Sequence, residues 1–317
     1  MRCMTDETLN LYINKCKSYV EFMLSQQQWS GLTKEETEVW LGNFRDLNLE
    51  EKYYVYKLLA NLIYYSEKDV LEALNEGVFS LLFNKDVLEK QITTDFTLSQ
   101  QTLSNTIKTE LRKTCFVPLL DSDSPHESGN YVSRLLVKNG LINAKQSMFL
   151  DKIVPAFKSG QFSNLVIVDD CVGSGEQLRT FWSEALVYEG NKEIALNSFC
   201  IARNIKAVYL TLFGYDKTIE KLKINLPKLK ICCVRALSEA QRVFSDYSYV
   251  WSDEDELRKA ISLFLSLTKN NGIPLYGFAD LDFAFIMHQT IPDWSLPLFW
   301  KENSDWKLLM RRKNSDA

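Results

Sequence analysis

Residues 165–177 read Leu-Val-Ile-Val-Asp-Asp-Cys-Val-Gly-Ser-Gly-Glu-Gln, and this stretch decides the fold. The four apolar, mostly β-branched residues 165–168 predict a buried strand. Asp169 and Asp170 close that strand, and a loop of small residues leads from them into a helix that begins near Glu176. Carboxylates at the C-terminal end of a strand lie where open α/β sheets bind their ligands. The sequence therefore predicts an α/β protein with a ligand site at this strand end.

The loop that follows the two acids has the composition of an anion-binding loop. A glycine-containing loop before a helix leaves backbone N–H groups available, and the helix dipole attracts negative charge. Two carboxylates suit the hydroxyls of a sugar or a metal ion, so the whole stretch suits a sugar phosphate. We predict that the phosphate is held by Cys171, Val172, Gly173, Ser174, Gly175, Glu176 and Gln177. The alternative is an ordinary strand–loop–helix turn with a capping acid and a glycine.

The composition is that of a globular protein without a strong charge bias. Of the 317 residues, 46% are hydrophobic and 25% are charged, and the formal net charge is −4. This charge excludes a global basic field of the kind that attracts nucleic acid. Seven cysteines occur without a Cys-x-x-Cys pair, which is typical of reduced thiols in a core. No signal peptide is evident and no apolar stretch approaches the ~20 residues of a membrane span, so we expect a cytoplasmic protein without membrane contact.

The sequence pattern changes at about residue 113. Residues 1–112 carry an amphipathic, helical periodicity with few glycines, which predicts an all-helical N-terminal domain. Residues 113–317 alternate strands with helices, which predicts a second domain built on a parallel sheet. The expected strands are 116–120, 165–170, 207–213 and 229–234, and the expected helices are 128–138, 149–159, 176–188, 216–225 and 253–269.

An aromatic and proline-rich segment follows Gly272. Its prolines exclude one long helix. One interpretation is a hood whose flat rings stack on a nucleobase. The other is a hydrophobic segment that closes the core. His288 lies in this segment, either as a catalytic acid or base or as a packed core histidine.

Residues 165–177 resemble the PRPP-binding motif of the phosphoribosyltransferases. In that motif four apolar residues, two acids and three variable residues precede a Ser/Thr-Gly pair. Asp169 and Asp170 match the acids, and Ser174-Gly175 matches the pair. Gln177 replaces the last hydroxyl residue of the motif, although its amide can donate a hydrogen bond to a phosphate. The resemblance implies a phosphoribosyltransferase-like α/β core.

The same resemblance implies roles for the two acids. One is expected to hold the ribose hydroxyls, directly or through Mg²⁺. The other is expected to stabilise the developing oxocarbenium charge or to orient the acceptor. Asp169 and Asp170 are therefore the predicted catalytic residues and Mg²⁺ ligands, and the sequence does not say which acid plays which role.

A second half of the site is expected in the loop before the helix at 128–138. In phosphoribosyltransferases an earlier strand of the sheet ends in a loop that holds the pyrophosphate group. The candidates at that place are Asp121, Ser122, Ser128 and Gly129. Acids in such a loop repel a naked pyrophosphate, so they fit this role only where Mg²⁺ bridges them to the phosphates. The alternative, an N-capped turn, fits these residue types equally well.

The layout of the whole chain resembles bacterial phosphoribosyltransferase-like proteins of conflict and anti-phage systems, some of them encoded beside retrons. The similar segments are residues 58–67, the core motif 168–175 and residues 296–300 with Trp306-Lys307. This resemblance implies an antiviral defence effector that partners hold inactive until infection. It also implies a homo-oligomer or a complex with protein or nucleic acid.

Three functions agree with these observations. The first is a glycosyltransferase of the phosphoribosyltransferase type, which binds PRPP or a related ribosyl phosphate or nucleotide with Mg²⁺ and acts at the anomeric carbon. The second is a non-catalytic nucleotide-sensing module, and the third is an assembly module of the same fold. Two carboxylates at the pocket end of a buried strand are costly to keep, which favours the first function.

Overall fold

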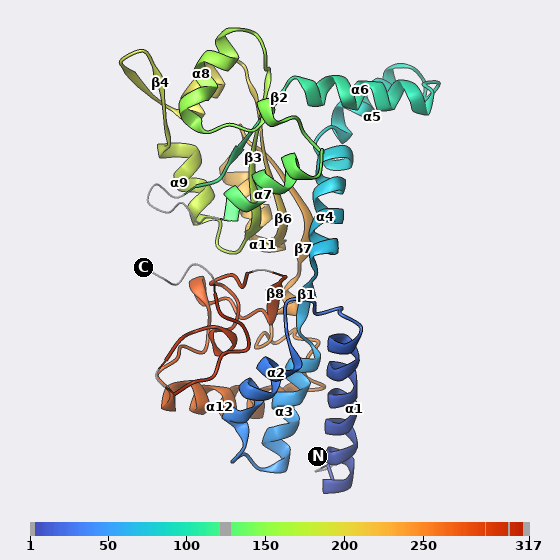
Figure 1. The fold of residues 1–317 in the computed structure, drawn as a ribbon, viewed down its shortest axis with the longest axis vertical. Coiled ribbons are helices and arrows are strands. Elements are labelled where there is room, and N and C mark those ends of the chain that lie inside the picture. The colour runs from blue at the N-terminus through green and yellow to red at the C-terminus, as the bar shows by residue number, and fades with distance from the viewer. Residues whose placement is uncertain (1–3, 121–127, 289, 304, 313–317) are drawn as a thin grey trace. The chain divides into compact units, whose positions relative to one another are not determined.

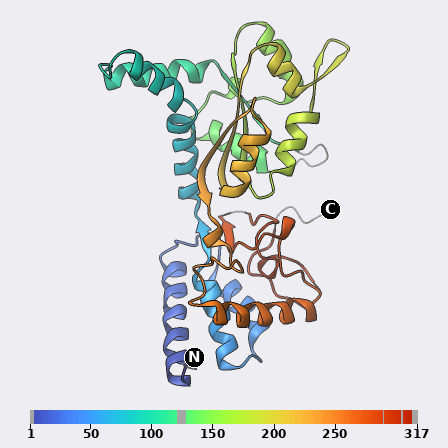
Figure 2. The same ribbon diagram turned by 180° about the vertical axis from the view of Figure 1, so that it is seen from behind.

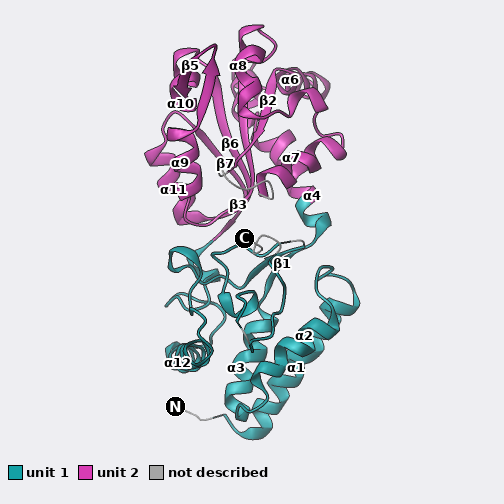
Figure 3. Cartoon of the chain, turned by 60° about the vertical axis from the view of Figure 1, so that its left-hand side comes forward, with its two compact units in different colours: residues 1–70, 238–317 teal, residues 71–237 magenta. Residues whose placement is uncertain are grey.

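The computed structural model describes residues 4–120, 128–288, 290–303 and 305–312 (Figure 1). The chain forms two compact units, which Figure 3 shows in different colours. Unit 1 contains residues 1–70 and 238–317, and unit 2 contains residues 71–237. Unit 2 is thus inserted in the sequence of unit 1. The predicted domains, 1–112 and 113–317, are divided at a different place in the chain. Their boundary concerns which parts fold independently, and it stays a prediction.

Unit 2 is built on a four-stranded parallel sheet, as the sequence predicts. The strand order is β2-β3-β6-β7. The strands are β2 (Thr114–Pro118), β3 (Asn164–Val172), β6 (Lys206–Tyr215) and β7 (Lys230–Leu237). Every residue of β3 except Cys171 is buried, and so is every residue of β6 except the first. Burial on both faces explains why these strands read as continuous apolar runs.

Helices follow the strands of unit 2 in alternation. They are α7 (Ser128–Lys138), α8 (Leu150–Lys158), α9 (Glu176–Glu184), α10 (Leu196–Ala202) and α11 (Asp216–Asn225). Side chains of α8 to α11 share one core cluster with Leu165, Ile167 and Tyr209. Gly77 packs against Leu210, which alternates with Tyr209 and so lies on the opposite face of the sheet.

The helix predicted at 176–188 is shorter than expected. It ends at Glu184, and an antiparallel hairpin of β4 (Leu186–Glu189) and β5 (Lys192–Ala195) follows. Glu189 pairs with Lys192, so Gly190 and Asn191 form a two-residue turn, and Gly190 has a φ of +63°. A glycine at positive φ is what such hairpin turns need, and this turn signal overrides the helical periodicity of the preceding residues.

Unit 1 joins helices from both ends of the chain. They are α1 (Asp6–Ser25), α2 (Lys34–Leu41), α3 (Leu49–Ala60) and α12 (Glu254–Asn270), and Figure 2 shows α12 from behind. The predicted capping box at Thr33 is present, with Glu36. One strand interrupts the predicted all-helical region 1–112: β1 (Ile63–Tyr65) pairs in parallel with β8 (Phe285–Met287). The partner is more than 200 residues away in sequence, so local periodicity could not identify this strand.

The aromatic C-terminal segment is buried in the core of unit 1. Phe283, Phe285 and Phe299 are fully buried. The indole N–H groups of Trp40 and Trp306 both donate to the carbonyl oxygen of Leu298, each over 2.9 Å. Rings with both faces covered cannot stack on a base, so this packing favours the closing-segment interpretation over the hood.

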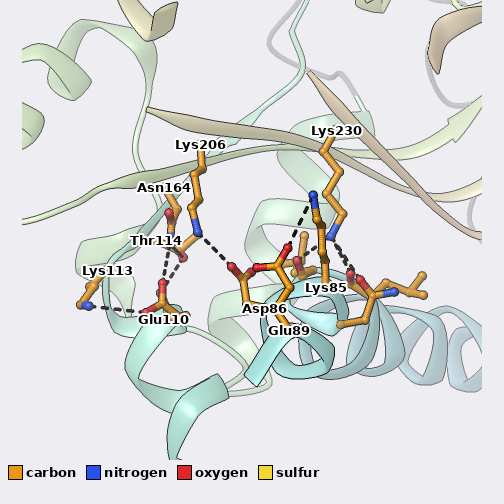
Figure 4. A network of polar contacts seen from close by, with 12 residues as sticks. Lys85, Asp86, Glu89, Glu110, Lys113, Thr114, Asn164, Lys206 and Lys230 are labelled. Carbon is orange, nitrogen blue, oxygen red and sulfur yellow. Dashed lines mark hydrogen bonds and ion pairs between the residues drawn. The ribbon is translucent and has the colours of Figure 1, made fainter. Parts of the chain in front are cut away.

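A helical hairpin of unit 2 is attached at the edge where the strands begin. The chain runs from α4 (Glu67–Glu76) through a short π-helix (Gly77–Leu81) into α5 (Asn84–Thr93) and α6 (Gln100–Arg112). The first residue of β6, Lys206, forms a 2.9 Å ion pair with Asp86 (Figure 4). The first residue of β7, Lys230, donates to the carbonyl of Leu82 over 2.9 Å. These polar contacts hold the hairpin at the amino edge of the sheet.

Within the described part of the chain, no helix combines the length and apolarity that crossing a membrane requires.

Candidate functional site

The two acids lie inside strand β3, and Cys171 and Val172 follow them before the strand ends. Asp169 pairs with Thr211 of β6, and the pairing continues through Cys171 and Val172. The predicted strand end at Asp170 is therefore wrong, because β6 extends to Tyr215 and supplies ladder partners for two more residues of β3. The carboxyl ends of β3 and β6 still lie at the same edge of the parallel sheet, where ligand sites of open α/β folds form.

Asp169 is hydrogen-bonded by groups from three elements. The Ser128 hydroxyl, at the first residue of α7, donates to Oδ1 over 2.8 Å. The Tyr209 hydroxyl, from β6, donates to Oδ2 over 3.0 Å, and the backbone N–H of Asp170 donates to Oδ1 over 2.9 Å. The predicted catalytic acid and the predicted pyrophosphate-loop serine therefore lie together in one cluster.

Burial dominates the electrostatics of the acid pair. Asp169 is 2% exposed and Asp170 is 4% exposed. Burial raises the pKa of Asp169 well above its usual value, and the neighbouring Asp170 charge raises it further, whereas the Ser128 and Tyr209 hydrogen bonds oppose this shift. Burial also raises the pKa of Asp170, against hydrogen bonds that involve Cys171 and Ser128. The pair therefore favours a proton or an incoming cationic or hydroxyl group.

The glycine loop after β3 leads into α9 through a residue in the left-handed conformation. Gly175 has a φ of +74°, and a Cβ there would lie 3.0 Å from side-chain carbons of Thr218 and Leu222 on α11. Glycine is thus required both by the backbone and by the close approach of α11. The N–H of Glu176 donates to the Ser174 hydroxyl over 3.2 Å, and α9 begins at Glu176. The N-terminal turn of α9 accordingly starts directly at this loop, as an anion site needs.

The predicted phosphate-binding residues divide into three structural groups. Cys171 and Val172 belong to strand β3, and Val172 is buried. Gly173, Ser174 and Gly175 form the connecting loop, and Glu176 and Gln177 open α9. The loop itself is therefore shorter than the predicted set of seven residues.

Two of the four pyrophosphate-loop candidates are described by the structure. Ser128 and Gly129 open α7, whereas Asp121 and Ser122 lie outside the described residues. A Cβ on Gly129 would lie 2.7 Å from the backbone nitrogen of Leu119, so glycine lets α7 return closely to the end of β2. Ser128 and Gly129 thus place the start of α7 beside the acids, and a pyrophosphate role for this segment stays a prediction.

His288 belongs to unit 1, and its side chain has a hydrogen-bond partner within that unit. Its Nδ1 lies 3.1 Å from the Ser30 hydroxyl, and its side chain is 22% exposed. This hydrogen-bonded setting agrees with the packed-histidine alternative.

Tyr209 is the site residue that sequence reasoning missed. It lies in an apolar strand and is paired with Ile167, two residues before Asp169. A tyrosine in a buried strand is usually a core residue, and the hydroxyl contact depends on the register between β3 and β6. Its only local signal is its own hydroxyl group, since a buried tyrosine hydroxyl usually finds a partner.

The acid pair is compatible with Mg²⁺ that arrives with a phosphate ligand. Mg²⁺ prefers oxygen ligands and is often bound by one or two carboxylates together with substrate phosphates and waters. The described residues contain no group of three or more His, Cys, Asp or Glu side chains that could hold a metal by themselves.

Comparison with known proteins gives one match. The sequence model of the family called PRTase-CE matches residues 37–312, which include parts of both compact units and all of residues 165–177. No curated protein matches the chain, and no solved structure does.

Proposed function

The chain belongs to the PRTase-CE family of phosphoribosyltransferase-like conflict-system proteins, and on that basis we propose that it binds PRPP or a related ribosyl phosphate or nucleotide and acts at the anomeric carbon. One observation carries the proposal: a buried carboxylate pair lies two residues before the end of β3, and a glycine loop then leads directly into α9. The pair suits a sugar and the loop suits its phosphate.

Each part of the site has a physical task in this proposal. The loop at Gly173–Gly175 and the first turn of α9 hold the 5-phosphate through backbone N–H groups. The carboxylates accept hydrogen bonds from the ribose hydroxyls and favour the positive charge that develops at the anomeric carbon. Because the site is buried, these electrostatic interactions are stronger than they would be in water.

Mg²⁺ is the proposed cofactor, and Asp169 and Asp170 are the residues that would hold it. The ion would supply neutralisation of the charge that builds on the leaving pyrophosphate. Bridging by such an ion would also make the acids of the predicted pyrophosphate loop compatible with a phosphate ligand.

Calorimetric titration of PRPP with Mg²⁺ into the purified chain tests the proposal. We expect saturable binding that is lost in Gly175→Trp, which fills the space between the loop and α11. Gly160→Trp is the matched control, because Gly160 has the same φ of +74° and nothing lies within 4 Å of its Cβ position. Absence of binding to the wild type would refute the proposal for the isolated chain.

The alternative is a non-catalytic nucleotide-sensing or assembly module of a defence complex. Gln177 favours it, because the last hydroxyl of the motif is missing there. Incubation with Mg²⁺·PRPP and a mixture of bases separates the two functions: an enzyme releases pyrophosphate, and a sensor binds without release. The proposed defence role, in a protein or nucleic-acid complex, is tested by phage plaque counts in cells that carry the wild-type or the Asp170→Asn chain within its natural operon.

A further inference from the structure

Helix α5 of unit 2 carries an apolar stripe on its outer face. Leu88 and Ile92 are 52% and 56% exposed, and they lie one helical turn apart. Phe96, in the turn that follows α5, is 65% exposed. Figure 1 shows α5 and α6 extending away from the sheet as a helical hairpin, and Figure 2 shows the same arrangement from behind. The stripe of Leu88, Ile92 and Phe96 is therefore open to solvent.

The rest of the hairpin surface is polar. Lys90 lies about 200° around α5 from Leu88, and its amine donates to the Thr106 hydroxyl of α6 over 3.3 Å. The opposite face of α5 is thus the one that meets α6. The exposed residues of α6 are Gln100, Gln101, Thr102, Asn105, Lys108, Thr109 and Arg112. An apolar stripe with polar surroundings is typical of a surface that binds another protein.

A defined turn holds the ring of Phe96 outward. Asp95 and Phe96 have φ of +48° and +57°, in the left-handed region that bulky residues seldom adopt. Their backbone N–H groups donate to the carbonyl groups of Ile92 and Gln91 over 3.2 and 2.8 Å, so the turn is hydrogen-bonded. The strain and the exposed ring are both unfavourable in a single chain, and a surface that covers the ring offsets them.

The charges beside the stripe suit a second α5 that runs antiparallel to the first. Lys85 lies in the first turn of α5, and Asp95 directly follows the C-cap residue Thr94. Both charges are unfavourable to the dipole of their own helix. In an antiparallel pair, the first turn of each helix faces the C-terminal end of the other. Lys85 then faces Asp95 and the last carbonyl groups of the second copy, and this contact occurs twice.

The apolar residues fit the same arrangement. When the pair is centred between Leu88 and Ile92, each leucine faces the isoleucine of the second copy. A centre at Ile92 would instead place Glu89 against Asp95 of the second copy, and like charges oppose that register. Charges of both signs also give no preference for a uniformly charged partner such as nucleic acid or an anionic membrane.

We propose that the stripe of Leu88, Ile92 and Phe96 binds a second copy of the chain, so that two copies join through antiparallel α5 helices around a two-fold axis. A two-fold interface must be complementary to itself, and the order of Lys85, stripe and Asp95 meets this condition. Three apolar side chains from each copy bury a small area, so the dimer is weak and forms as the concentration rises. This inference is independent of the proposed function, because none of these residues belongs to the candidate site.

Sedimentation velocity over a range of protein concentrations tests the proposal. We expect the average mass of the wild type to rise from that of one chain toward that of two. Leu88→Ser and Ile92→Ser should each raise the dissociation constant of the dimer by about tenfold or more, because each change removes two apolar side chains from the interface. A wild type that stays a single chain at the highest concentration would overturn the proposal and assign the stripe to a different protein.

The matched control for the stripe is Leu11→Ser. Leu11 lies on α1 of unit 1 and is 54% exposed, so it resembles Leu88 in type and exposure. We expect the dimer of this variant to equal that of the wild type. Equal weakening by Leu11→Ser and Leu88→Ser would overturn the proposed location. Urea midpoints show whether both variants are folded, and the charge variants decide the question if Leu88→Ser lowers its midpoint.

Charge reversal tests the antiparallel arrangement. Lys85→Glu should weaken the dimer by about fivefold at low salt, and adding Asp95→Lys should restore most of the loss, because opposite charges again face each other. Lys34→Glu is the control, since the Lys34–Glu38 pair at 3.7 Å matches the exposed Lys85–Glu89 pair at 3.8 Å. It should leave the dimer unchanged. A double variant as weak as Lys85→Glu alone would overturn the arrangement.

Discussion

The two edges of the sheet in unit 2 differ in how deeply their charged side chains are buried. At the amino edge, Lys206 faces Asp86 in an ion pair whose side chains are 65% and 31% exposed. At the carboxyl edge, two acids lie side by side and are almost completely buried. The first arrangement costs little and contributes little, since exposed pairs are worth ~0–1 kcal/mol. The second is destabilising unless a ligand compensates it, which is the property expected of a functional edge.

Neutralising one buried acid gives the largest expected effect. Asp170→Asn should weaken Mg²⁺·PRPP binding by about 100-fold, because hydrogen bonds to a charged group contribute ~1.5–3 kcal/mol. The same change should raise the free energy of unfolding at pH 7, because it removes a buried charge beside Asp169. Calorimetry and urea unfolding measure the two effects. A variant that loses both binding and stability would show that the acids serve the fold rather than the ligand.

Enlarging the glycine loop is the next effect in size. Gly175→Ala should destabilise unit 2 by ~1–2 kcal/mol more than Gly160→Ala does. Both residues have a φ of +74°, but only the Gly175 Cβ would meet side chains, at 3.0 Å. The melting temperatures and urea midpoints of the two variants give the comparison. Equal destabilisation would mean that α11 moves aside and that the loop is not closely held.

The pH dependence of stability follows from the raised pKa of Asp170. In the unfolded chain this acid titrates near 3.8, and burial raises that value in the folded protein. The folded state therefore binds its proton more tightly, and the stability from this group is present below pH ~4 and is lost as the pH rises through the folded pKa. The advantage of Asp170→Asn over the wild type should accordingly grow with pH. A constant difference between pH 4 and pH 8 would contradict the raised pKa.

The smallest effect is expected at the amino edge. Lys206→Met and Asp86→Asn should each cost less than ~1 kcal/mol, and their coupling should be ~0.2–1 kcal/mol and fall with added salt. Unfolding at low and high ionic strength measures this coupling. A coupling well above ~1 kcal/mol that persists at high salt would remove the contrast between the two edges.

The sequence predicted the parts of the site that are continuous in the chain. The apolar run before Asp169, the loop at Gly175 and the start of α9 form one local unit, so residue pattern and turn chemistry suffice to predict them. The parallel sheet also followed from the alternation of strands and helices. The residue pattern of β3 alone could not predict where this strand ends, because its length depends on how far the neighbouring strand β6 extends.

The contacts of Asp169 depend on non-local geometry. Tyr209 reaches Asp169 only because β6 pairs with β3 in one particular register. Ser128 reaches it only because Gly129 allows α7 to return against Leu119. The pairing of β1 with β8 has the same character, since its strands come from opposite ends of the chain. A one-residue change of register would remove such contacts without altering any local pattern.

The insertion of unit 2 within unit 1 has a consequence for synthesis of the protein. Ribosomes deliver the chain from its N-terminus, and domains generally fold as units as they emerge. Residues 71–237 are complete before residues 238–317, which carry β8 and the aromatic segment around Leu298, have been made. Unit 2, which contains the two acids, can therefore fold on the ribosome before residues 238–317 of unit 1 have been made. A nascent chain stalled after residue 237 would present the candidate site before the core that joins Trp40 to Trp306 exists.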